Sequence, residues 1–256
     1  MHLPKFNLMK IYLVVFLFLF SGLLFSSCDG NAPIDFPTEV IQLSGVSDSV
    51  FQILLDDSKL ICLDQYLIEE MKEINSIDIE ETHIAPIVAA LQMVYLDSTI
   101  VAANTIKELH IHALCRQQLH QTMVKEDTLQ PFFSNWFANG ISGNSQLDEL
   151  IAFYNLDIDS LGNAQYLIST DVGLNHQALA AKIRDFPFVK SANAQACIGD
   201  GSQIELIDSS PDQINLVFSY GWGDCPSGCI HRHYWDLSVS GSGIVELIRE
   251  SGDKLP

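Results

Sequence analysis

The stretch that decides the fold is Gln213-Ile214-Asn215-Leu216-Val217-Phe218-Ser219-Tyr220-Gly221-Trp222. Every second side chain from Ile214 to Trp222 is apolar, and this period of two is typical of a strand with one buried face. Similar runs occur at 203–207, 230–238 and 243–249, and Asp200-Gly201 before them is a strong turn signal. We therefore expect a C-terminal antiparallel β-meander.

A strand–helix–strand unit is expected directly upstream of the meander. Residues 164–169 and 188–195 have strand character, and 175–186 place Leu179, Ile183 and Phe186 on one helical face. A short amphipathic helix over 146–154 precedes the unit. The expected fold class is α+β.

The N-terminal half has a helical period instead. Helices are expected from about residue 58, where Asp57 or Ser58 would be the cap, and over 84–96, 98–123 and 129–138. The change of period predicts a helical region over 48–143 and an α+β domain with the meander over 144–256. One continuous α+β domain whose helices pack on the sheet is the alternative.

Residues 1–27 have the layout of a secretory signal peptide. Lys5 and Lys10 precede an apolar run, and Ser26-Ser27 precede Cys28. This ending resembles the lipobox of bacterial lipoproteins, which implies acylation of Cys28 and attachment to a membrane of the cell envelope. An uncleaved anchor, or cleavage without a lipid, is the alternative. Residues 28–47 would then form a tether.

The charge of the chain argues against nucleic acid as a partner. Removal of the leader leaves 11 Lys and Arg against 32 Asp and Glu, whereas phosphate binding requires clustered basic residues. A lipid would be the main attachment to the membrane, any protein partner is unknown, and no cofactor is expected.

Cys225 and Cys229 bracket a Pro-Ser-Gly turn, and export permits a disulfide between them. Zinc held by Cys225, Cys229, His231 and His233 is the competing interpretation, although the spacing is not a common zinc pattern. Two free thiols are the third possibility. Cys62 and Cys115 could form a second bridge, which would leave Cys197 unpaired.

Two further segments resemble known sequences. Residues 165–195, with Tyr166 to Ser169 and Phe186-Pro187-Phe188-Val189, resemble part of the propeptide-inhibitor fold of subtilisin-like proteases, which also implies a ferredoxin-like arrangement. The block from Gly221 to Trp235 is similar to the C-terminal ends of uncharacterised secreted or lipoprotein sequences, chiefly from Bacteroidota.

No catalytic residue is expected, because no nucleophile elbow or Ser/His/Asp set is evident. His110, His112 and His120 are interpreted as surface or core histidines of a helix. The leading hypothesis is a lipid-anchored, non-enzymatic binding or structural module. A hydrolase or zinc protein centred on 225–233 and a propeptide-like protease inhibitor are the alternatives.

Overall fold

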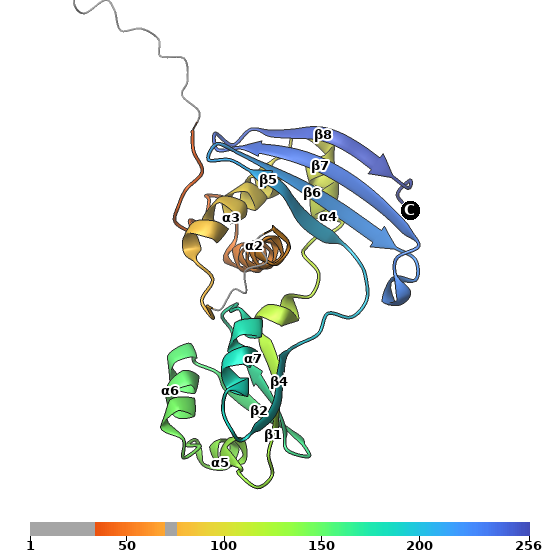
Figure 1. The fold of residues 1–256 in the computed structure, drawn as a ribbon. Helices are drawn as coiled ribbons and strands as arrows, with labels where there is room; N and C mark the ends of the chain where they lie inside the picture. The colour runs from red at the N-terminus through yellow and green to blue at the C-terminus, as the bar shows by residue number, and fades with distance from the viewer. Residues whose placement is uncertain (1–33, 70–75) are drawn as a thin grey trace, which may run out of the picture. The chain divides into compact units, whose positions relative to one another are not determined.

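The computed structural model describes residues 34–69 and 76–256, and these form an α+β fold (Figure 1). The strands make two four-stranded antiparallel sheets, in the orders β5-β6-β7-β8 and β2-β3-β1-β4. Each sheet has its own cluster of buried hydrophobic side chains. The expected fold class is confirmed, with helices, a strand–helix–strand unit and a C-terminal meander.

The meander consists of β5 (Gln203–Ser209), β6 (Gln213–Trp222), β7 (His231–Ser240) and β8 (Val245–Gly252). Buried side chains of β6 and β7 lie opposite one another, pairing Ile214 with Val239, Leu216 with Leu237 and Phe218 with Trp235. The alternation seen in the sequence therefore directs one face of this sheet into a core, as expected.

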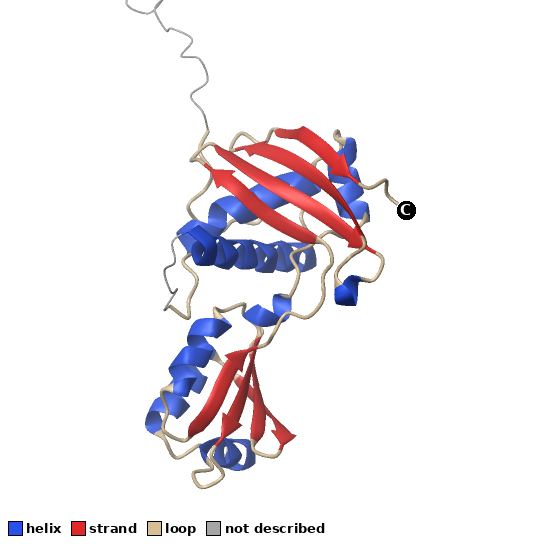
Figure 2. Cartoon of the chain, turned by 45° about the vertical axis from the view of Figure 1, so that its right-hand side comes forward, coloured by secondary structure: helices blue, strands red, loops and turns tan. Residues whose placement is uncertain are grey.

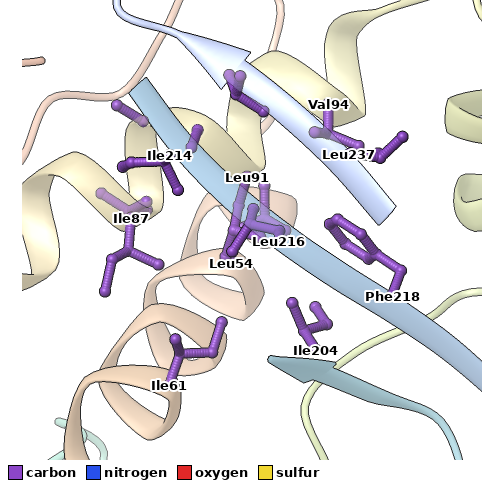
Figure 3. Packing of buried hydrophobic residues seen from close by; sticks show 14 of the residues in the cluster. Leu54, Ile61, Ile87, Leu91, Val94, Ile204, Ile214, Leu216, Phe218 and Leu237 are labelled. Carbon is purple, nitrogen blue, oxygen red and sulfur yellow. The ribbon is translucent and has the colours of Figure 1, made fainter. Parts of the chain in front are cut away.

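Helices α2 (Asp48–Glu69) and α3 (Glu81–Leu96) contact strands of that sheet, and α4 (Val101–Glu108) contacts α3 and contributes side chains to the same core. Figure 3 shows Leu54 and Leu91 of the helices close to Leu216 of the sheet. Full burial of one such side chain stabilises the folded state by about 1.5–3 kcal/mol relative to its exposure to water. The N-terminal helices and the C-terminal sheet thus share one core.

Helix α2 begins ten residues before the expected cap at Asp57 or Ser58. The Ser47 hydroxyl accepts the Val50 N–H at 3.4 Å and so caps the first turn. Asp57 and Ser58 therefore lie inside the helix, and both are buried. The expected cap is wrong because apolar residues at helical spacing continue upstream to Val50.

The expected helix over 98–123 ends at Glu108. His110 and Cys115 adopt left-handed backbone conformations, with φ of 50° and 70°, and a 3-10 turn (η1, Arg116–Leu119) leads into strand β1 (Gln121–Glu126). Thr122 and Val124 alternate with exposed neighbours in β1. Their β-branched side chains favour a strand over a helix.

Strand β1 belongs to a second unit that also contains α5 (Phe132–Asn139), α6 (Ser145–Tyr154), β2 (Asp157–Gly162), β3 (Gln165–Ser169), α7 (His176–Arg184) and β4 (Val189–Ala194). The expected strand–helix–strand elements are all present, but β1 lies between β3 and β4. The order of elements is βααββαβ, and the split sheet is that of a ferredoxin-like βαββαβ unit with one additional helix after β1. Its helices and strands enclose the second hydrophobic core (Figure 2).

The unit 121–194 is therefore inserted between the helices and the meander that form the first core. This differs from the division expected at residue 143, with 48–143 helical and 144–256 α+β. Helical and strand periods report local structure only, whereas the pairing of β1 with β3 and β4 is set by residues that lie far along the chain.

The expected tether over 28–47 packs on the first core where the structure describes it. Phe36 and Val46 are buried, and the buried Gln92 side chain of α3 binds the backbone of Ile41 and Leu43 at 2.9 and 2.7 Å. The leader 1–27 and Cys28 lie outside the described residues. Within the described ranges no single helix is long and apolar enough to span a membrane. Helices α3 and α4 reach that length and apolar content only when they are taken together, and the chain bends by 99° between them.

Candidate functional site

A cavity of about 190 Å³ lies in the first core, between the helices and the meander. Its walls come from α2, α3, α4, β5 and β6, and include Leu54, Leu91, Ile106, Ile204 and Phe218. Figure 3 shows Leu54 and Leu91 on the helices, with Phe218 and Ile204 on the strands. A comparable cavity of about 150 Å³ in another protein stays dry and binds benzene. The volume suits a small apolar molecule.

Three basic side chains, those of Lys107, His110 and His112, also line this cavity. They are partly or fully exposed, whereas Leu54, Leu91 and Ile106 are buried. The basic groups therefore mark the side on which the cavity approaches solvent. We call Lys107, His110 and His112 the basic rim.

The end of α4 builds the basic rim. The His110 N–H bonds to the Lys107 carbonyl at 3.2 Å, and the Ile111 N–H bonds to the Ile106 carbonyl at 3.1 Å. These two bonds, with His110 left-handed, define a Schellman motif. Ile106 and Ile111 are both buried and both line the cavity, so the turn fixes the rim to the apolar wall.

A buried carboxylate holds His112 in place. Oδ2 of Asp57 lies 2.7 Å from Nδ1 of His112, and Oδ1 of Asp57 accepts the Ala113 N–H at 3.1 Å. Burial raises the pKa of Asp57, and the hydrogen bond from His112 opposes this shift. Since Nδ1 faces Asp57, the other ring nitrogen, Nε2, is on the opposite edge of the imidazole.

Lys107 lies over an aromatic ring of the same wall. Its Nζ donates to the Tyr95 carbonyl at 3.1 Å and is 5.5 Å from the centre of the Tyr95 ring. Both contacts fix the ammonium without neutralising it, because neither partner carries a formal charge.

Polar groups of α2 also bind the inserted unit. Nε2 of His120 lies 2.9 Å from Asp56, while its Nδ1 lies 2.9 Å from the Thr170 carbonyl. Lys59 Nζ donates to the Gly173 carbonyl at 2.9 Å. The hydrogen bond with Asp56 raises the pKa of His120, and burial lowers that of Lys59. These contacts join α2 to the inserted unit. They involve neither Asp57 nor His112, which contact each other beside the cavity.

Cys225 and Cys229 are joined in a disulfide. Asp200 accepts the Cys229 N–H at 3.0 Å and pairs with Arg232, which holds the pKa of Asp200 at about 2. His231 contacts the Asp253 carboxylate, and the buried His233 contacts the Asp253 carbonyl and Glu250. Within residues 34–69 and 76–256, no three His, Cys, Asp or Glu side chains are arranged to hold a metal ion.

The second disulfide joins Cys115 to Cys197, not to Cys62. Cys115 lies beyond α4, in the segment that enters the inserted unit, and Cys197 lies in the segment that leaves it. Cys62 is buried in α2, and burial raises the pKa of its thiol to about 12. The bridge expected between Cys62 and Cys115 assumed a helix through residue 115, which the structure does not contain.

Sequence reasoning missed this site. The local pattern predicts Asp57 as a possible helix cap and places His110 and His112 in one helix, and nothing in it distinguishes Lys107. A signal was present, because Asp56, Asp57 and Lys59 interrupt the apolar run of α2, and buried charges require partners.

Comparison of the chain with protein-family models, with curated proteins and with solved structures gave no match.

Proposed function

We propose that this chain is a lipid-anchored cell-envelope protein whose folded part is a module that binds a small, mainly apolar molecule. The observation that supports the binding role is the cavity of about 190 Å³ with apolar walls and the basic rim at one side. A few polar groups at an otherwise apolar pocket are typical of ligand sites.

Binding is favoured over hydrolysis by the composition of the cavity wall. The residues that line it include no Ser, Thr or Cys, and Tyr95 supplies the hydroxyl present. His112 is oriented by Asp57 as a general base would be, but a base requires a nucleophile or a positioned water to act on.

The sequence alternatives have less support. Both cysteines of the proposed zinc set are joined in the disulfide between Cys225 and Cys229, and a cysteine binds zinc as a free thiolate. The ferredoxin-like arrangement of 121–194 supports an analogy of fold with protease propeptides, and a fold alone does not define a function.

The binding role is tested by filling the cavity. Ala103 lines it and is fully buried, so Ala103→Leu places extra carbon atoms where a ligand would lie. Thermal unfolding is measured with and without a small hydrocarbon such as benzene. We expect benzene to raise the unfolding temperature of the natural protein and to have little effect on Ala103→Leu, whose circular dichroism confirms that it folds. An equal rise in both proteins contradicts the cavity as the binding site.

The anchor is tested separately. Cys28→Ala should move the protein from the membrane fraction to the soluble fraction, because the acyl acceptor is removed. A variant that stays in the membrane fraction contradicts the lipoprotein assignment and leaves the binding role untouched.

A further inference from the structure

We infer that the ligand of the cavity is a small monocarboxylic acid, with its hydrocarbon part between α2, α3 and the meander and its carboxylate at the basic rim. This inference rests on the proposed binding function and adds the chemical class of the ligand.

The side chains at the rim are basic in a chain that is acidic as a whole. The sequence has 13 Lys and Arg against 32 Asp and Glu, yet Lys107, His110 and His112 come together within six positions. The residues that line the described cavity include no Asp or Glu. The site is therefore basic within an acidic protein, and it attracts an anion in preference to a cation.

Three acidic groups lie near the rim: Asp57 pairs with His112, Asp97 lies within electrostatic range of Lys107, and Glu108 is exposed in the same stretch of chain. None of the three lines the cavity. Asp57 is 0% exposed and lies behind His112, with one oxygen on the imidazole and the other on the Ala113 N–H. Among the described residues, Lys107 makes its contacts with the Tyr95 carbonyl and ring. Its ammonium keeps hydrogen-bonding capacity, because it has three donors.

Two carbonyls at the end of helix α4 are already occupied by N–H groups of the following turn. The Ile106 and Lys107 carbonyls accept the two N–H groups of the Schellman motif. The helix terminus would otherwise repel a carboxylate through its partial negative charge.

The size of the cavity limits the hydrocarbon part. A volume of about 190 Å³ is slightly larger than one that admits benzene. A chain or ring of roughly six carbons fits, and each methylene that it buries adds to the affinity.

The probes are hexanoate, hexan-1-ol and hexylamine, which share one hydrocarbon chain and differ in the head group. Binding to the full folded chain is followed by NMR titration. We expect hexanoate to bind about tenfold or more tightly than hexan-1-ol, because a charge-assisted hydrogen bond replaces a neutral one, and hexylamine to bind most weakly.

Two variants test the rim. His110→Asn removes the imidazole while keeping a residue that tolerates the left-handed conformation, and Lys107→Met removes the ammonium. Each should reduce the preference for hexanoate over hexan-1-ol, whereas Lys125→Gln, an exposed charge on β1, should not.

The outcomes separate the two proposals. If none of the three probes binds, the proposed binding function fails. If hexan-1-ol or hexylamine binds as tightly as hexanoate, the cavity remains a binding site and the carboxylate inference is overturned. A preference for hexanoate that persists unchanged in both rim variants also overturns it.

Discussion

Asp57, in the middle of α2, holds His112, 55 residues away, through a contact of 2.7 Å in which the carboxylate has no exposure to solvent. The same carboxylate binds the Ala113 N–H. One buried acid therefore fixes both a side chain of the basic rim and the backbone that follows it.

Asp57→Ala should destabilise the protein, because it leaves the His112 and Ala113 donors without their acceptor. We expect a loss of about 1–3 kcal/mol in the free energy of unfolding, measured by urea denaturation, because two partly buried donors are left unpaired. Gln52→Ala is the matched control, since Gln52 is exposed on the same helix. Equal stability of the two variants would show that the Asp57 contacts contribute nothing.

His176 should make the protein sensitive to acid. It is 0% exposed, its Nδ1 lies 2.8 Å from the Thr122 hydroxyl, and Nε2 has no partner among the described residues. Burial lowers its pKa from 6.5 to about 4. Its contribution to stability is present above 6.5, where the unfolded chain also has a neutral imidazole, and is lost as the pH falls towards 4.

The full effect of that shift is about 3 kcal/mol. The measurement is the free energy of unfolding from neutral pH down to about 4. His176→Gln, which does not titrate, should lose less stability over this range than the natural protein. A parallel decline in both proteins would rule out His176 as the acid-sensitive group.

The Cys115–Cys197 bridge should stabilise the folded protein. It joins the segment that enters the inserted unit to the segment that leaves it, and so closes a loop between residues 82 positions apart in the sequence. Cys115→Ser should cost about 2–5 kcal/mol. Peptide mapping of the non-reduced protein should recover one peptide pair joined through Cys115 and Cys197. A pair joined through Cys62 and Cys115 would contradict the structure, and Cys62→Ala should leave the map unchanged.

The local sequence pattern predicted the individual helices and strands whose period extends over neighbouring residues. The alternation from Ile214 to Trp222 was sufficient for β6, and Leu179 with Ile183 was sufficient for α7. The sequence did not reveal that β1 pairs with β3 and β4, because a six-residue strand of mixed polarity resembles the continuation of a helix.

The candidate site was harder to predict, for a physical reason. A cavity is a gap left by side chains from α2, α3, α4, β5 and β6, and its volume depends on how these elements pack. The partner of Cys115 and the contact of His112 with Asp57 likewise depend on where helix α4 ends. Such features follow from tertiary structure, and the local sequence signals them only through the charges at Asp56, Asp57 and Lys59 that interrupt the apolar run of α2.

The most direct test of the binding cavity is an NMR titration of the folded chain, labelled at Ile, Leu and Val methyl groups, with hexanoate. We predict saturable shifts of the Leu54, Leu91 and Ile106 methyl signals, which line the cavity, with no comparable shift at Ile168 and Leu179 in the other core. Shifts that do not saturate, or that are equal in both cores, would contradict the account.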